Sequence, residues 1–334
     1  MSPSENRPPR PGMTVPLPGP LHAHREGLSR LVDYGYTNVW SVEVDGADAF
    51  TPLAMAAAWE PRLHLGTAIV PAFTRGPAVL AQSVAALADA APGRFTVGIG
   101  TSSEVIVERW NGIAFVDPYK RVRDVVRFLR EALDGSRVAR HFDTFHVDGF
   151  RLRVRPEHRP QVLVAGLREG MLRLAAREGD GAVINWLSPS DVRQVAAVIH
   201  GAAGDAERQI VARIFVCPSD DAALVRRAAK SAIVAYLNVP VYAAFHRWLG
   251  RGDLLGDVWA AWVAGDRIAA ADAIPDEVVD DLIVHGSVAQ CRRRIQEYFD
   301  NGVTSSSLMI MQLDPQIDHW TAVEDLSPSA GADA

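Results

Sequence analysis

Glycine and hydroxyl side chains gather at the end of one apolar segment, in the run RFTVGIGTSSEVIVERWNG at residues 94–112. Gly98 and Gly100 carry no side chain, so a ligand can approach the backbone, and Thr101, Ser102 and Ser103 add hydroxyl groups. A glycine turn with a hydroxyl helix cap explains the same residues equally well, so both interpretations stay open. The third glycine of a dinucleotide fingerprint is absent, so the run does not support a Rossmann-type site.

Two further segments carry candidate ligand-binding residues at or near their ends. The run GLREGM at residues 166–171 offers Gly166, backbone N–H groups at a helix start, and Arg168, which together could hold an anion. Glu43 is the second-last residue of the earlier segment VWSVEV. A lone acid in that position is either part of a site or a structural carboxylate that pairs with an arginine.

Metal and serine-nucleophile chemistry find little support. His22 and His24 resemble the paired histidines of metal-dependent barrel hydrolases, but later segments supply no further His or Asp ligands at their ends. We therefore expect two exposed histidines at a helix start and no metal. The G-x-S-x-G motif of serine hydrolases is absent.

Eight strand-like segments recur along the chain, each followed by a longer segment with helical periodicity. Most lack polar alternation, which is typical of parallel strands buried on both faces. Eight such units predict an α/β protein with a (β/α)8 TIM barrel, and the alternative is an open doubly wound sheet with an appended helical domain. The segments are residues 13–17, 37–44, 63–70, 94–100, 161–166, 181–187, 209–217 and 306–311.

The barrel is expected to form a single domain over residues 13–314, with flexible tails at 1–12 and 315–334. Two intervals are too long for simple connections. Residues 135–160 predict a β-hairpin with Asp148-Gly149 as its turn, and residues 221–283 predict extra helices that cap one end of the barrel.

Three helix starts are visible in the sequence. Thr51-Pro52 predicts an N-cap followed by proline at the first helical position. Ser188 and Asp191 predict a reciprocal capping box, and Asp117-Pro118 predicts the start of a long helix.

Composition narrows the partners and the compartment. The net charge is −6 and the 34 basic residues are scattered, so no nucleic-acid partner is expected. Neither Cys217 nor Cys291 belongs to a C-x-x-C pair, which fits a reducing cytoplasm. No apolar run approaches the ~20 residues that span a bilayer, and the first residues lack an apolar signal core, so we expect neither a membrane partner nor export.

The sequence resembles the luciferase-like flavin and deazaflavin barrel oxidoreductases, and looks most like the actinobacterial branch that depends on coenzyme F420. The similarity extends from Met13 to Met311, with the blocks in the family's order. The blocks are VWSVEV, LGTAIVPAFTRGPAVLAQSVAALADAAPGRFTVGIGTSSEVIVERWNG, PYKRVRDVVRFL and VLVAGLREGMLRLAAREGDGAVINWL.

The resemblance implies a mouth, at the C-terminal ends of the strands, that binds the tricyclic ring of F420 or FMN. A non-prolyl cis peptide backs the ring in F420 members, and the matching bond is Ala68–Ile69. Glu43 matches the acid at the polar edge of the ring and is the candidate catalytic residue. The remaining matches lie beside the ring, the ribityl chain and the phosphate, or at the end of the sixth strand: Gly100, Thr101, Ser102, Ala165, Gly166, Leu167, Arg168, Asn185 and Trp186.

This sequence departs from the family at two positions. Val44 stands where many members have a histidine after the acid, so a mechanism with a protonating histidine there does not carry over. Leu167 replaces a second glycine of the phosphate-side loop. Trp186 also has an ordinary explanation, because large aromatic side chains at element ends usually serve packing.

The hypothesis from sequence is a cytoplasmic oxidoreductase, dimeric like many members of the family, that moves a hydride between F420 and a small organic substrate. The uncharged rim suggests a neutral or weakly polar substrate, such as a carbonyl or a conjugated alkene. Two alternatives are an FMN-dependent monooxygenase of the same family and a non-catalytic protein that binds F420 or flavin.

Overall fold

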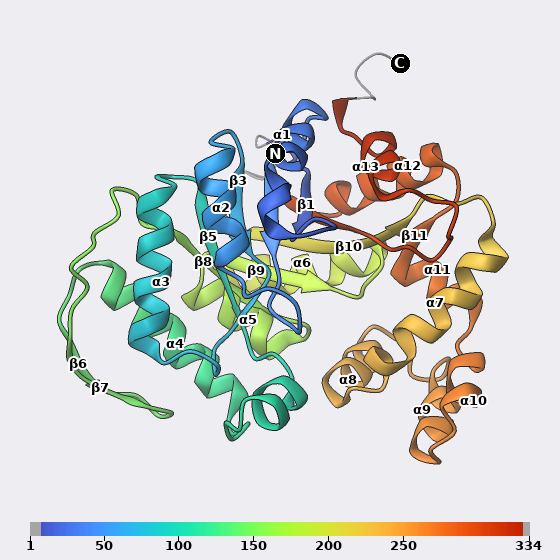
Figure 1. Ribbon diagram of the computed structural model, residues 1–334. Coiled ribbons are helices and arrows are strands. Elements are labelled where there is room, and N and C mark those ends of the chain that lie inside the picture. Colours follow the sequence, from blue (N-terminus) through green and yellow to red (C-terminus); the bar gives the residue numbers. More distant parts are fainter. Residues whose placement is uncertain (1–7, 330–334) are drawn as a thin grey trace.

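A closed barrel of parallel strands forms the centre of the computed structural model, which describes residues 8–329 (Figure 1). The barrel order is β1, β2, β3, β5, β8, β9, β10 and β12, and β12 pairs back with β1. The predicted TIM barrel and its eight strand segments are confirmed. The strands are β1 (Gly12–Val15), β2 (Asn38–Ser41), β3 (His64–Thr67), β5 (Phe95–Gly100), β8 (Gln161–Ala165), β9 (Gly181–Asn185), β10 (Gln209–Cys217) and β12 (Ser305–Ile310).

Two short strands extend this sheet. Strand β4 (Val70–Pro71) follows β3 and pairs with the end of β5. Strand β11 (Ile283–His285) was not predicted, and it pairs with residues 215–217 of β10. Since β9 pairs only with residues 209–213 of β10, β11 occupies the rest of the same edge.

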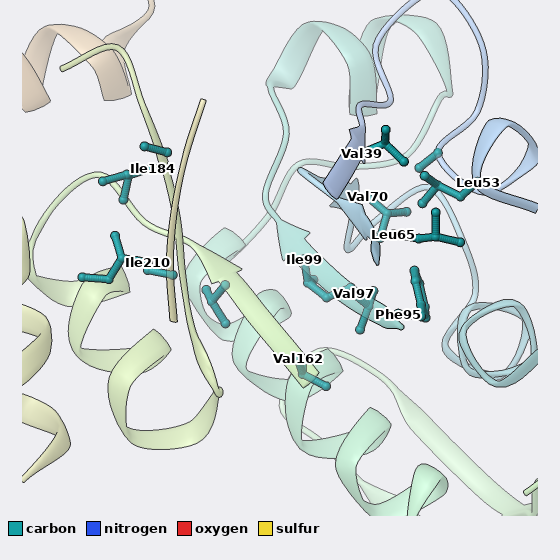
Figure 2. Close-up of a cluster of buried hydrophobic side chains, with 14 of the residues drawn as sticks. Val39, Leu53, Leu65, Val70, Phe95, Val97, Ile99, Val162, Ile184 and Ile210 are labelled. Carbon is teal, nitrogen blue, oxygen red and sulfur yellow. The ribbon is translucent and has the colours of Figure 1, made fainter. Parts of the chain in front are cut away.

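Alternate residues of each strand point to opposite faces, and both faces are apolar for most of their length. The outward residues pack under the surrounding helices, as the labelled side chains Val97, Ile99 and Val162 show in Figure 2. The inward residues form a separate cluster inside the barrel, made of Trp40, Ala68, Leu163, Val183 and Val211. This filled interior explains why the strands read as nearly continuous apolar runs.

Helices cover the outside of the barrel between successive strands. They are α1 (His24–Asp33), α2 (Thr51–Trp59), α3 (Pro77–Ala90), α4 (Pro118–Leu133), α5 (Glu169–Glu178), α6 (Pro189–Ala203) and α12 (Val288–Asp300). The Ser188–Asp191 capping box and the Asp117-Pro118 start are confirmed. The Thr51 cap is not: Thr51 is already helical, and Asp48 Oδ1 accepts the N–H groups of Phe50 and Thr51 instead.

The two long intervals form additions on opposite sides of the barrel (Figure 1). One is the predicted hairpin of β6 (Val138–His141) and β7 (His146–Phe150). Its turn lies at Phe142–Phe145 rather than at Asp148-Gly149, because Gly149 lies inside β7, where the pairing is irregular and its φ is +77°.

The other addition is helical, as predicted. Its helices are α7 (Ala222–Leu237), α8 (Pro240–Trp248), α9 (Gly256–Val263), α10 (Arg267–Asp272) and α11 (Asp276–Leu282). They share an apolar cluster with Trp186 and Phe215 of the barrel. Among the described residues no single helix is long and apolar enough to cross a membrane, while the pair α7 and α8, bent by 105°, meets that test by length and composition alone.

The C-terminal part of the chain differs from the expected flexible segment. Helix α13 (His319–Asp325) lies within it, and Ala322 and Val323 are buried. The Tyr36 hydroxyl donates to the Val323 carbonyl at 2.9 Å. Of the expected tails at 1–12 and 315–334, residues 1–7 and 330–334 lie outside the described part. At the N-terminal side, Gly12 already belongs to β1 and Arg10 forms a β-bridge with Ser305.

Candidate active site

Partly exposed residues from neighbouring strand ends lie together on one side of the barrel mouth. Ile69 follows β3, Thr101 and Ser102 follow β5, and Ala165 and Asn185 end β8 and β9. Because these strands are consecutive in the barrel order, the structure brings the predicted cofactor residues together. The surface they form carries no charged side chain until Arg168, which is exposed.

The Ala68–Ile69 peptide is cis, as the resemblance implies. The adjacent glycines of β5 allow other parts of the barrel to approach closely. A Cβ atom on Gly98 would lie 2.2 Å from the Thr67 carbonyl oxygen, and one on Gly100 would lie 2.8 Å from Ile69 Cδ1. These glycines therefore make room for the neighbouring backbone and for the Ile69 side chain, and Ile69 itself presents the surface to the mouth.

The hydroxyl groups after β5 are used unequally. Thr101 Oγ1 donates to the Ser102 carbonyl at 3.0 Å, and Ser103 Oγ accepts the Ile106 N–H at 3.3 Å, at the start of the π-helix Val105–Trp110. The cap interpretation thus holds for Ser103. The Ser102 hydroxyl has no hydrogen-bond partner within residues 8–329, and Ser102 adopts a φ of +61°.

The loop after β8 leads directly into α5. Arg168 is the N-cap residue in an extended conformation, and no side chain caps this helix. The first N–H groups of α5 therefore lack intrahelical acceptors and are available to an anion. Gly166 is buried, and a Cβ there would lie 3.0 Å from Leu172 Cδ2, so its small size serves the packing of α5.

Glu43 is held by an arginine. Arg75 Nη1 donates to Glu43 Oε1 at 2.6 Å and to Oε2 at 2.7 Å, with side chains only 19% and 15% exposed. The Ala49 N–H and the Thr74 hydroxyl also donate to this carboxylate, at 2.9 and 3.3 Å. These contacts favour the structural interpretation, in which Glu43 joins the loop after β2 to the loop after β4.

Asn185 and Trp186, at the end of β9, differ in burial and in their contacts. Trp186 is 4% exposed and stacks on Phe215, with ring centroids 3.8 Å apart, so its burial favours packing over cofactor contact. Asn185 is half-buried, and its amide donates to the Tyr242 hydroxyl at 3.2 Å. Of the two predicted residues, only Asn185 stays accessible from the mouth.

Arg213 was missed by the sequence analysis. It lies between Val211 and Phe215 on β10, with the inward parity of Val211, and its Cα pairs in register with Asn185 and Ser307. Burial lowers the pKa of its guanidinium. In the sequence, Arg213 is the only charged residue of the apolar run QIVARIFVC. It was missed because only the residues that follow each strand were considered as candidates.

The other polar regions do not compete with the mouth. A cavity of about 320 Å³ is lined by His64, Phe95 and Gln161, which begin β3, β5 and β8, so it lies at the opposite end of the barrel. Within residues 8–329 no cluster of three or more His, Cys, Asp or Glu residues could hold a metal. His22 is exposed as expected, but His24 is buried, with Nε2 3.1 Å from the Gly19 carbonyl oxygen.

Comparisons with known proteins identify a matching family and relatives in sequence. The model of the luciferase-like monooxygenase family matches residues 3–305. The chain is 26% identical over 280 residues to 5,10-methylenetetrahydromethanopterin reductase of Methanolobus tindarius, covering 81% of this chain and 84% of the relative.

Two solved structures share the fold. One is the coenzyme F420-dependent tetrahydromethanopterin reductase of Methanopyrus kandleri, with a TM-score of 0.78 and 18% identity over 96% of this chain and 97% of that one. The other is an F420-dependent secondary alcohol dehydrogenase in complex with an F420-acetone adduct, with a TM-score of 0.75 and 16% identity over the same shares.

Proposed function

The chain belongs to the luciferase-like monooxygenase family, and from this membership we propose that it is a coenzyme F420-dependent oxidoreductase. The names of the two structural relatives, both F420-dependent, support this cofactor. When bound, F420 supplies C5 of its deazaflavin ring as the hydride donor or acceptor. The observation that carries the proposal is the small, uncharged surface of Ile69 and Ala165, beside the uncapped start of α5.

The residues present fit such a group. Ile69 and Ala165 offer a low apolar surface to a planar ring, and the free Ser102 hydroxyl is available to a ribityl chain. The N–H groups at the start of α5, together with Arg168, suit the phosphate. Each of these groups comes from a different strand end, which is the usual construction of a site in this type of barrel.

Glu43 is proposed as a positioning residue. Its carboxylate accepts hydrogen bonds from Ala49, Thr74 and Arg75, so little accepting capacity is left for a reacting proton. By fixing the loops after β2 and β4, it would hold the Ile69 side of the mouth in place. No protonating histidine follows it, since the next residue is Val44, so the proton is left to solvent or to another group.

Cofactor titration tests the proposal. F420 added to the purified protein should give a saturable fluorescence change with one site per chain, and FMN should bind more weakly. Arg168→Ala should weaken F420 binding roughly 10-fold, since it removes one charge-assisted contact. Arg173→Ala is the matched control on the same helix, where Arg173 pairs with Glu169 at 2.8 Å. Tight FMN binding without any F420 response would overturn the assignment.

An FMN-dependent monooxygenase is the second candidate, because the matching family is described as luciferase-like monooxygenases. Such an enzyme would consume oxygen and require a source of reduced FMN. Oxygen uptake with chemically reduced FMN, compared with F420-linked turnover under nitrogen, separates the two functions.

A further inference from the structure

We propose that Arg213, with the Tyr242 hydroxyl and the Asn185 amide beside it, forms an anion site for a carboxylate of the substrate. The proposal rests on the proposed function and names its substrate class: small organic monoacids. It also replaces the expectation of a neutral substrate, which considered only the residues that follow the strands.

Arg213 faces the barrel interior from the side opposite the proposed cofactor surface. In the closed eight-stranded barrel, β10 is the fourth strand from β3 in either direction. Arg213 of β10 therefore lies across the barrel from Ala68 and Ile69, which follow β3. Arg213 is two residues from Val211, which faces the interior, so the Arg213 side chain also points inward. Arg213 pairs with Asn185, the last residue of β9, so it lies at the height of the mouth. A molecule lying on the open face of a ring backed by Ile69 would therefore meet Arg213.

The Arg213 guanidinium has no counterion in the described part of the chain. No carboxylate oxygen among the described residues lies within 4.0 Å of it, and its Nε is buried with no hydrogen-bond partner. Its contacts are the Met309 sulfur, 2.6 Å from Nη2, and the Phe215 ring, whose centroid is 5.1 Å from Cζ. Arg213 is half-buried, and a partly desolvated cation without a counterion is unfavourable. An anion that enters the mouth would supply the missing counterion without competing with a protein carboxylate.

The neighbouring groups define the ligand further. Asn185 Nδ2 donates to the Tyr242 oxygen, so the phenolic hydrogen is free to be donated elsewhere. The ionisable neighbours that influence Arg213 are two tyrosines, Tyr236 and Tyr242, and no second cation is among them. One positive charge with two neutral partners matches a monoanion such as a carboxylate better than a phosphate dianion.

Paired acids and amides test this site. Acetate, pyruvate and benzoate are titrated calorimetrically into the F420-loaded protein, each against its uncharged amide, and inorganic phosphate is titrated separately. At least one acid should bind roughly 10- to 100-fold more tightly than its amide, which is the range expected for a hydrogen-bonded charge pair. If no acid binds more tightly than its amide, or if phosphate binds more tightly than every acid, the carboxylate site is refuted.

Variants of Arg213 test whether the preference for the acid depends on this residue. Arg213→Met should abolish the preference for the acid while leaving the amide's affinity unchanged, and Arg213→Lys should retain part of the preference. Arg25→Met, at an exposed arginine of α1, controls for the lost charge. Arg213→Met is expected to fold, because it replaces a half-buried charge without a counterion by an apolar side chain of similar length. If it does not fold, Arg213→Lys and Arg213→Gln provide the same comparison.

Two outcomes separate this proposal from the cofactor assignment. F420 affinity should change by less than about threefold in Arg213→Met, since the cofactor residues lie on the other strands. A large loss of F420 affinity with the acid preference intact would mean that Arg213 binds the cofactor and would overturn the substrate site. If F420 does not bind at all, the same acid and amide titrations on the cofactor-free protein still decide whether the anion site exists.

Discussion

The Glu43 carboxylate and the Arg75 guanidinium form a mostly buried pair at the mouth, and a second acid stands beside them. Asp48 Oδ1 lies 3.6 Å from Arg75 Nη2, and the Arg75 guanidinium also lies over the Phe50 ring, 5.0 Å from its centroid. Such a pair contributes to stability chiefly because removing one partner leaves the other charge buried and unpaired. Its two residues come from different loops, so the pair also fixes the shape of the mouth.

We predict that Glu43→Gln and Arg75→Gln each lower the free energy of unfolding by about 1–3 kcal/mol, because each leaves an unpaired polar group. The double variant should lose less than the sum of the two, as expected for residues in contact. Urea unfolding measures both effects, and F420 titration should show weaker binding in each single variant. Unchanged stability of Glu43→Gln together with abolished turnover would instead indicate direct catalytic contact.

Strand β5 shows how one element serves both the core and the site. Its outward residues Phe95, Val97 and Ile99 belong to the main hydrophobic core (Figure 2). Its inward glycines, Gly98 and Gly100, let the β3 backbone and Ile69 approach. The strand thus requires large apolar residues on one face and no side chain on the other, because the two faces pack against different neighbours.

Alanine substitutions should rank according to what the added Cβ meets. Gly98→Ala should be the most destabilising, by more than about 3 kcal/mol, because the contact is with a backbone carbonyl oxygen, whereas Gly100→Ala should cost about 1–3 kcal/mol and weaken F420 binding by shifting Ile69. Gly201→Ala, inside α6 with nothing within 4 Å, is the control and should stabilise by about 0.5–1 kcal/mol. Equal effects of all three in thermal unfolding would contradict the packing explanation.

At the scale of the whole molecule, a buried polar contact joins the barrel to the helical addition. Arg251 Nη2 donates to Asp191 of α6 at 2.7 Å and to Asp281 of α11 at 2.6 Å. His246 of α8 is fully buried, and neither ring nitrogen has a partner among the described residues. The addition is therefore fixed to the barrel, and the arrangement makes folding sensitive to protonation.

Burial, with Arg251 nearby, lowers the pKa of His246 from 6.5 to about 4. The folded protein keeps this histidine neutral, while the unfolded chain takes up a proton below pH 6.5, so stability falls as the pH drops from 6.5 towards 4. His246→Leu should reduce the loss of stability between pH 7 and pH 5 by about 2 kcal/mol. Urea unfolding at both pH values measures this difference.

Part of the pH dependence should remain in that variant. Burial also lowers the pKa of His64 to about 4, and His64 therefore destabilises the protein over the same range. A variant as sensitive to pH as the original protein would contradict the assignment to His246.

The sequence alone determined the order of the eight barrel strands and of the main helices between them. Apolar runs bounded by turn residues, such as QVLVAG and GAVINWL, identify buried parallel strands because both of their faces must avoid water. Caps such as Ser188–Asp191 are equally local and were recognised from four consecutive residues. The hairpin turn, the β11 strand and helix α13 were misplaced or missed, because tertiary pairing and packing rather than local composition decide them.

The composition of the mouth was decided only by the tertiary structure. The sequence shows Glu43, but the loops must fold before Arg75, 32 residues away, neutralises it. The same holds for Trp186, which the helical addition buries, and for Arg213, whose inward direction and missing counterion depend on the closed barrel. Electrostatic pairing and exclusion from water depend on neighbours that are distant in the sequence, and those neighbours are set only when the strands close.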